Sequence, residues 1–249
     1  MEPKPFAMGV RIEHPQSVIN RSQYGKDDPM LPPADYKLVK HLDDETVYTF
    51  CMCPGGYVVA ATSEEGHVVT NGMSYQDRGG DNANAALLVT VNPKDFPSED
   101  VLAGVEMQEK IEKAAFCAGG GNYCAPAQKA GDFLAGRPST GEGSVKPTYR
   151  PGVTWCDLHD VLPEKITKAL ETALPMLDGS LKGFAHPDSV LTAPETRSSS
   201  PVRILRDESK QSVTLKGFYP AGEGAGYAGG IMSAAIDGIQ CAEALIANL

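Results

Sequence analysis

The first half of the chain alternates short apolar runs with tight turns, which is the pattern of β-strands. The turn sequences Pro54–Gly56 and Glu64–Gly66 separate three such runs and predict an antiparallel meander. The predicted strands are residues 5–13, 46–52, 57–62, 67–71 and 85–91, the last being the most apolar and therefore expected in the centre of a sheet. Residues 14–45 are polar and rich in proline and aspartate, and we expect an ordered or partly ordered connection there.

Helical spacing of apolar residues dominates the second half. Ser98 is expected to cap a helix that runs to Cys117, where three glycines end it. Further helices are predicted over residues 126–134, 164–174 and 231–246. Because strand-rich and helix-rich blocks are segregated, the sequence predicts an α+β fold with an antiparallel or mixed sheet.

The chain ends in a glycine-rich turn between a predicted strand, Val213–Ala221, and the last helix. Gly224 to Gly229 satisfies the string G-x-G-x-x-G of dinucleotide-binding folds. Such a fold also needs a second strand with an acidic residue about 20 positions further on. No such strand follows the helix, so we expect this chain not to complete a dinucleotide-binding domain by itself.

The turn still has the properties of an anion site, because glycines let a ligand approach the backbone and a helix start presents unpaired N–H groups. The alternative is close packing of strand on helix with no ligand. Gly222 to Gly230 contains five glycines and an acidic residue, Glu223, and this composition favours the ligand.

Composition and charge exclude several other classes. The chain has 249 residues, a net charge of −10 and 41% hydrophobic residues, as in ordinary globular proteins. The negative charge and the lack of a basic patch argue against nucleic-acid binding. No run approaches the roughly 20 apolar residues of a membrane helix, and no signal-peptide core is present. Six cysteines are too few for a disulfide scaffold, so we expect free thiols and a cytoplasmic location.

Other constellations leave two interpretations open. Cys51 and Cys53 share a strand face, where they are either packing residues or a redox pair. Arg197, Ser198 and Ser199 suit a carboxylate or a phosphate, or form a solvated loop. Gly120, Gly121 and Asn122 end a helix or line a ligand loop. No hydrolase triad, metal motif or carboxylate pair occurs, so we expect no metal and name no catalytic residue.

Several segments closely resemble the carboxy-terminal part of the bacterial FAD-dependent dehydrogenases, also called NAD(P)/FAD-dependent oxidoreductases. The segments are Gly217–Gly230, Ser233–Ala235, Asp237–Gly238, Phe50–Gly56, Gly119–Tyr123, Gly131–Phe133 and Glu195–Pro201. The resemblance covers essentially the whole chain and implies an FAD-dependent oxidoreductase. It implies that residues 1–190 form a substrate-facing insert and residues 191–249 return to the FAD-binding domain.

The resemblance also implies site residues. Gly222 and Glu223 would contact the ribityl or pyrophosphate region of FAD, and Gly226 to Gly230 would lie beside the flavin ring. The full implied set is Gly222, Glu223, Gly224, Gly226, Tyr227, Ala228, Gly229, Gly230 and Ile231.

The amino-terminal FAD-binding half of that family has no counterpart in this sequence. We therefore expect a fragment that lacks FAD on its own. Its expected partners are that missing half, a small-molecule substrate and, as a further option, a second copy of the chain. The rival hypothesis is a non-enzymatic α+β binding module that uses the glycine turn for a phosphate or a protein.

Overall fold

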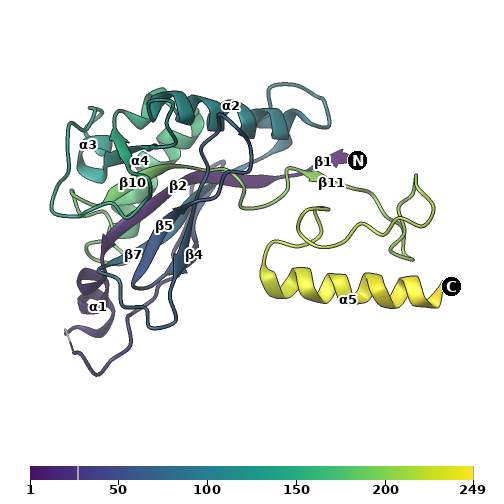
Figure 1. The fold of residues 1–249 in the computed structure, drawn as a ribbon, viewed down its shortest axis with the longest axis horizontal. Helices are drawn as coiled ribbons and strands as arrows, with labels where there is room; N and C mark the ends of the chain where they lie inside the picture. The colour runs from purple at the N-terminus through teal and green to yellow at the C-terminus, as the bar shows by residue number, and fades with distance from the viewer. Residues whose placement is uncertain (27, 249) are drawn as a thin grey trace. The chain divides into compact units, whose positions relative to one another are not determined.

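The computed structural model describes residues 1–26 and 28–248 and has an α+β architecture (Figure 1). The strands are β1 (Glu2–Pro3), β2 (Phe6–Pro15), β3 (Val39–His41), β4 (Thr46–Cys53), β5 (Gly56–Ala60), β6 (Thr70–Ser74), β7 (Asn82–Val91), β8 (Ala125–Lys129), β9 (Val153–Trp155), β10 (Val190–Glu195) and β11 (Val202–Arg203). The α-helices are α1 (Gln16–Tyr24), α2 (Ala103–Ala118), α3 (Ala130–Leu134), α4 (Glu164–Asp178) and α5 (Ile231–Ala247). The predicted α+β class with a mixed sheet is thereby confirmed.

The chain divides into two compact units. The sheet unit consists of residues 8–90 and 109–196, and the terminal unit consists of residues 1–7, 91–108 and 197–249. The predicted assignment of residues 1–190 to a substrate-facing insert and of 191–249 to an FAD domain stays a prediction.

A seven-stranded mixed sheet organises the sheet unit, in the order β3-β4-β7-β2-β10-β8-β9. Its edge pair β8–β9 is parallel, and the pairs β3–β4, β4–β7, β2–β10 and β8–β10 are antiparallel. Nearly every residue of β2 and β7 is buried, as expected for interior strands covered on both faces. The prediction that residues 85–91 form an inner strand is confirmed.

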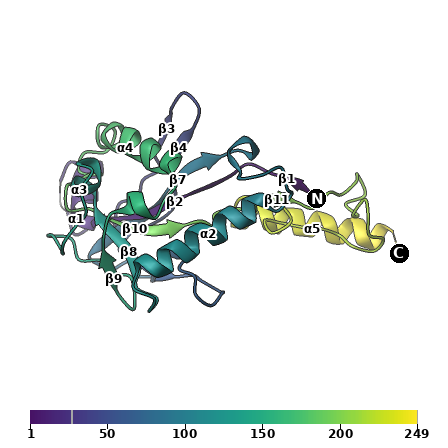
Figure 2. The same cartoon turned by 90° about the horizontal axis from the view of Figure 1, so that it is seen from above.

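Helix α4 shows how the apolar spacing of the sequence becomes packing. Ile166, Leu170, Leu174 and Leu177 follow one another at helical intervals, and all four are fully buried. The helix contacts β3 and β4, as Figure 2 shows. Pro163 precedes its first turn, where the missing N–H of proline costs no hydrogen bond.

The predicted meander is wrong in its pairing. Strands β5 and β6 form a separate two-stranded hairpin, and β4 belongs to the large sheet. The reason is that β3 and β7 already occupy both edges of β4, so β5 finds no free backbone groups there. A register shift between Phe50 and Cys53, with Cys51 at a φ of 41°, ends the regular pairing just before the turn.

Four further elements differ from their predictions. Residues 16–24 form α1 inside the predicted connection, and residues 125–129 form β8 where a helix was predicted. Helix α2 begins at Ala103, five residues after the predicted cap. Ser98 does not cap it and instead accepts a hydrogen bond from Asp100 N at 3.3 Å. Residues 213–221 form no strand in the described part of the chain. Their backbone makes isolated hydrogen bonds, such as Val213 N to Leu205 O at 3.3 Å and Phe218 N to Leu215 O at 3.3 Å, and no ladder.

A fully buried arginine joins several strands of the large sheet. Arg11 of β2 forms an ion pair with Glu195 of β10, in which Nη1 donates to both carboxylate oxygens, at 3.0 and 2.9 Å. Its Nε donates to Asn84 Oδ1 at 2.9 Å, and Nη2 donates to Cys51 O and to Cys53 Sγ. Burial raises the pKa of the Glu195 carboxyl, and the Arg11 charge opposes that shift. The arginine therefore compensates a buried carboxylate and fixes the irregular end of β4.

We predict that Arg11→Met destabilises the sheet unit by about 3–5 kcal/mol, because it leaves Glu195 buried without its partner. The double variant Arg11→Met/Glu195→Leu should regain part of this loss, since it removes both charges. Exposed Lys37 provides the control, and Lys37→Met should change stability by no more than about 0.5 kcal/mol. Denaturant unfolding measures all three, and a single Met variant as stable as the wild type would contradict the prediction.

Candidate functional site

The glycine-rich turn before α5 is closed by its own backbone. Gly226 N donates to Glu223 O at 2.9 Å, and Tyr227 N donates to Gly222 O at 3.0 Å. Gly222 and Gly226 have φ angles of 72° and 85°, a region that side-chain-bearing residues rarely adopt. The turn is thus formed within the chain.

Gly226 is also required by a close approach. A Cβ at this position would lie 2.5 Å from Val202 O and 2.9 Å from the Cα of Arg203. Ile204 N donates to Ala225 O at 3.1 Å in the same region. The turn therefore packs backbone to backbone against the segment that begins with β11.

Gly224 and Gly229 have no such role. A Cβ at either position would meet no atom within 4 Å, and neither residue has a φ in the left-handed region. The fold of this chain therefore does not explain why these positions lack a side chain. Both face open space on the outside of the turn, where a ligand can approach the backbone.

The start of α5 leaves backbone donors available. No side chain caps the helix at Gly230, whose carbonyl accepts from Ala234 N at 2.9 Å. Among the described residues, the amides of Ala228, Gly229 and Gly230 donate no hydrogen bond. Together with the positive end of the helix dipole, these amides form a surface that attracts an anion.

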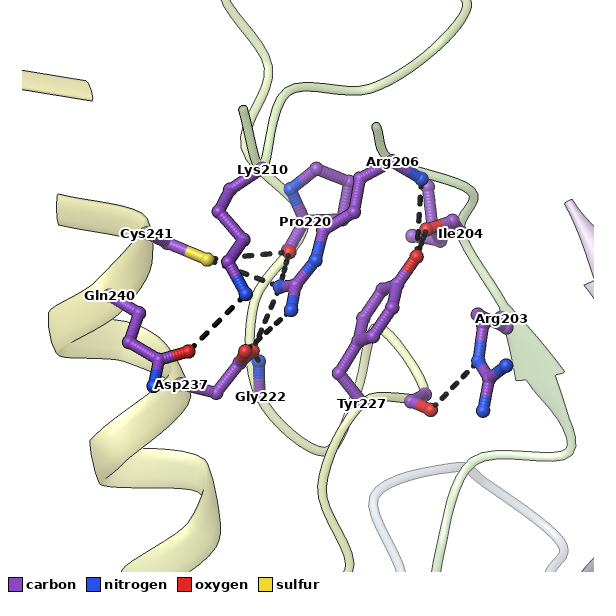
Figure 3. Close-up of polar contacts among 11 residues, drawn as sticks. Arg203, Ile204, Arg206, Lys210, Pro220, Gly222, Tyr227, Asp237, Gln240 and Cys241 are labelled. Carbon is purple, nitrogen blue, oxygen red and sulfur yellow. Dashed lines mark hydrogen bonds and ion pairs between the residues drawn. The ribbon is translucent and has the colours of Figure 1, made fainter. Parts of the chain in front are cut away.

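An ion pair links this turn to α5 and to the chain after β11 (Figure 3). Arg206 donates through Nη2 to Asp237 Oδ1 at 2.5 Å and through Nη1 to Asp237 Oδ2 at 2.9 Å. Gly222 N donates to Asp237 Oδ2 at 2.9 Å, and Arg206 Nη1 also donates to Pro220 O at 2.8 Å. Two charged side chains thus fix both the first residue of the turn and the middle of the helix.

The electrostatics of this pair follow from its contacts. The hydrogen bond from Arg206 lowers the pKa of Asp237 to about 2. Burial raises this pKa, and the hydrogen bond from the Gly222 amide lowers it further. The same hydrogen bond raises the pKa of Arg206. Asp237 is therefore ionised at neutral pH and acts as a fixed acceptor for the turn.

Tyr227 completes the same cluster. The guanidinium carbon of Arg206 lies 3.6 Å from the centre of the Tyr227 ring, a cation–π contact. The Tyr227 hydroxyl donates to Ile204 O at 3.0 Å and accepts from Arg206 N at 3.1 Å (Figure 3). The tyrosine thus serves the structure of the turn, and its predicted contact with a cofactor stays a prediction.

Additional charges lie near the turn. Arg203 Nε donates to Gly226 O at 3.3 Å. The pKa of Lys4 is lowered by burial and by Arg203, while Glu223 raises it. The charges of Arg203 and Glu223 therefore act on Lys4. Two cations, Lys4 and Arg203, thus lie near Glu223, the predicted acidic contact residue of the turn.

The two predicted accessory loops belong to different units. Arg197, Ser198 and Ser199 are in the terminal unit, as the turn is, and Ser198 Oγ donates to Ala7 O at 2.5 Å. Gly120, Gly121 and Asn122 belong to the sheet unit, where Asn122 Oδ1 accepts from Cys124 N at 3.1 Å. The helix-ending function of the glycines is confirmed, and a ligand function of either loop stays a prediction.

Sequence reasoning missed Arg206 and Asp237 as a pair. They are 31 positions apart and come from an irregular segment and a helix. The available signal was weak: Asp237 is an acidic residue in an apolar helix, and Arg206 belongs to the densest cationic run of the sequence.

All six cysteines are free thiols in the structure, with Cys51 exposed and Cys53 buried. Burial raises the pKa of the Cys53 thiol, with the Arg11 charge opposing, so this thiol is not activated. The described residues contain no group of three or more His, Cys, Asp or Glu side chains arranged to hold a metal ion.

The structure is thus an α+β chain in which three backbone amides before α5 donate no hydrogen bond among the described residues. Residues 5–198 match the family model described as "FAD-dependent protein, C-terminal domain-like", and the chain belongs to this family. An "Uncharacterized protein" of Clostridium beijerinckii is 51% identical over 250 residues, which cover 99% of this chain and 47% of that protein. The chain thus spans about half the length of this relative. Among the described residues, no helix is long and apolar enough to cross a membrane.

We predict opposite effects of alanine at two glycines of the turn. Gly226→Ala should destabilise the terminal unit by about 1–3 kcal/mol, because its Cβ collides with Val202 O and its φ is unfavourable. Gly224→Ala should leave stability unchanged or raise it by up to about 1 kcal/mol. Denaturant unfolding compares them, and equal losses would contradict the different roles inferred for these glycines.

The Arg206–Asp237 pair predicts a pH dependence. Because the folded-state pKa of Asp237 is lowered to about 2, from an ordinary value of 3.8, its stabilisation is present above about pH 4 and disappears as pH falls toward 2. Asp237→Asn should therefore cost about 1.5–3 kcal/mol at pH 7, and the difference from wild type should shrink below pH 4.

The control lies on the same helix. Glu243 is exposed, and Glu243→Gln should not change stability at any pH tested. Stability curves from pH 7 to pH 3 measure both variants, and a pH-independent effect of Asp237→Asn would argue against the ion pair.

Proposed function

We propose that this chain is the carboxy-terminal portion of an FAD-dependent oxidoreductase, in which the glycine turn and the start of α5 contact the cofactor. The observation that carries the proposal is the outside of the turn. The fold has room for a side chain at Gly224 and at Gly229, but both positions are glycine. Nearby, the amides of residues 228–230 have no hydrogen-bond partner among the described residues. The match of residues 5–198 to an FAD-dependent family supports FAD as the ligand.

The residues of the turn fit such a cofactor. The amides of Ala228, Gly229 and Gly230 would donate to its oxygens, and the start of α5 at Ile231 would add a positive field. Gly222 and Glu223 would contact the ribityl or pyrophosphate region. Bound FAD would supply the hydride or electron transfer, and the protein would position it and tune its surroundings.

The apolar face of α5 supports a partner for this segment. Ile231, Met232 and Ile246 are 88%, 72% and 70% exposed, and Ile236 and Ile239 are more than half exposed. Contiguous apolar surface of this kind marks an interaction site. We propose that an amino-terminal FAD-binding half of a longer protein covers this face, and that a homodimer covers it when that half is absent.

The remaining predicted roles belong to the same proposal. Residues 1–190 would face a small-molecule substrate, and residues 191–249 would complete the FAD-binding domain. Arg197, Ser198 and Ser199, and separately Gly120, Gly121 and Asn122, would line the substrate or cofactor. The protein would act in the cytoplasm.

The test uses the longer C. beijerinckii relative and a chimera of it. We predict that the purified relative is yellow and releases about one FAD per chain on denaturation, whereas the isolated 249-residue chain carries none. A chimera then replaces the matching half of the relative with this chain. In it, Gly229→Val should lower the FAD content about tenfold or more without lowering thermal stability of the apoprotein.

Gly141 is the matched control for this experiment. It also has open space around its missing Cβ and no left-handed φ, but it lies outside the turn. Gly141→Val should leave the FAD content of the chimera unchanged. A colourless relative without flavin would contradict the proposal and favour a non-enzymatic module that binds a phosphate or a protein through this turn.

A further inference from the structure

A groove of about 670 Å³ in the sheet unit lies apart in sequence from every residue of the glycine turn. One wall is the β5–β6 hairpin, and the other is the segment 142–150. Its volume is in the range of small-molecule sites. Its side chains form three groups with different chemistry, and all of them lie within one compact unit.

The first group is an aromatic wall. The rings of Tyr57 and Tyr75 meet edge to face, with their centres 5.6 Å apart. Met73 lies opposite Tyr57 in the hairpin register, and it is 51% exposed, while Tyr75 is 66% exposed. Tyrosine and methionine surfaces favour another aromatic ring, through ring–ring and sulfur–ring contacts.

The second group consists of charged side chains of both signs. Lys146 and Arg150 line the groove, and so do Asp81 and Glu142. Within the described chain, none of these four side chains forms a hydrogen bond or an ion pair. Charges of both signs on one groove favour a ligand that also carries both, because an ion of one sign meets repulsion from two of the four.

The third group is a buried polar floor. Asn82 is 7% exposed, and its Nδ2 donates to Glu13 Oε1 at 3.2 Å and to Lys146 O at 2.8 Å. Both amide hydrogens are thereby used, while Asn82 Oδ1 accepts no hydrogen bond from the described residues. Thr148 donates to Glu13 through N and Oγ1, and its Oγ1 accepts from Val58 N at 2.8 Å.

The floor is therefore held in place before any ligand arrives, which reduces the entropy cost of binding. Glu13 itself is fully buried and occupied by these donors, so it serves the floor and not the ligand. The open acceptor is Asn82 Oδ1, which suits an ammonium group that also meets Asp81 or Glu142.

We propose that this groove binds a small aromatic zwitterion of the chemical class of an aromatic α-amino acid. The ring lies against Tyr57, Tyr75 and Met73. The carboxylate pairs with Arg150 and Lys146, since a guanidinium can bind it through two parallel hydrogen bonds. The ammonium group meets Asn82 Oδ1 and the two acidic side chains. This proposal does not depend on flavin binding.

The test measures binding of L-phenylalanine to the full 249-residue chain by titration calorimetry and by ligand-observed NMR. Three analogues each remove one recognised feature: 3-phenylpropionate lacks the ammonium group, phenethylamine lacks the carboxylate, and L-alanine lacks the ring. We expect L-phenylalanine to bind with a dissociation constant below about 10 mM, and each analogue to bind about tenfold more weakly. Equal affinity of either singly charged analogue, or no binding of L-phenylalanine, would overturn the proposal.

Surface variants locate the site. Arg150→Gln should weaken L-phenylalanine about tenfold and should not weaken phenethylamine, whereas Asp81→Asn should weaken L-phenylalanine and should not weaken 3-phenylpropionate, because each change removes a charge that repels the analogue. Tyr75→Leu should weaken all ring-bearing ligands. The control, Lys182→Gln, changes an exposed lysine of the same unit away from the groove and should change nothing. Wild-type affinity in Arg150→Gln and Asp81→Asn, with an unchanged circular dichroism spectrum, would overturn the assignment to this groove.

Discussion

The ion pair between Arg206 and Asp237 holds together a segment that has almost no sheet. Between β11 and α5 the described chain contains no helix and no strand, so few ladder hydrogen bonds fix its backbone. The pair supplies hydrogen bonds to this backbone in place of a strand ladder. Asp237 accepts from Gly222 N, and Arg206 donates to Pro220 O and lies over the ring of Tyr227. Because the two side chains are only 7% and 12% exposed, their attraction is weakened less by water than that of a surface pair. The ion pair therefore adds to the backbone hydrogen bonds that close the turn, and it connects the turn to α5.

The sheet unit uses a buried charge in a related way. Arg11 satisfies Glu195 and at the same time binds the carbonyl of Cys51, where β4 leaves its regular pairing. Space for this guanidinium exists because Gly72 has no side chain, since a Cβ there would lie 2.1 Å from Arg11 Nη2. A buried pair of this kind adds little net stability over an apolar pair, but it penalises any register in which one partner is left alone. In both units an arginine fixes irregular backbone that hydrogen-bond ladders leave unsupported.

The glycines of the turn separate into two kinds, and this separation connects the fold to the proposed function. Gly222 and Gly226 are explained by backbone conformation, and Gly226 also by its contact with Val202. A side chain at Gly224 or Gly229 would meet none of the described residues within 4 Å, which leaves the backbone there open to a ligand. Residues 5–198 match a family described as FAD-dependent, and the proposed function assigns that space to the cofactor. The apolar side chains of α5 are exposed as well, and the proposal assigns a protein partner to that face.

The sequence by itself determined the features that depend on local spacing. The periodicity of Ile166, Leu170 and Leu174 predicted α4, and the same reasoning predicted α5, because a 3.6-residue period reports which face is buried. The continuous apolar run of residues 85–91 predicted the inner strand β7. The run of glycines located the turn for the same local reason. Tertiary structure decided everything that depends on the choice of a distant partner. It placed β5 with β6 in a hairpin apart from β4, joined Arg206 to Asp237 across 31 positions, and left residues 213–221 without a ladder. Strand pairing and ion pairing are contacts between remote residues, and a linear pattern does not specify which of several competing partners is close enough to form them.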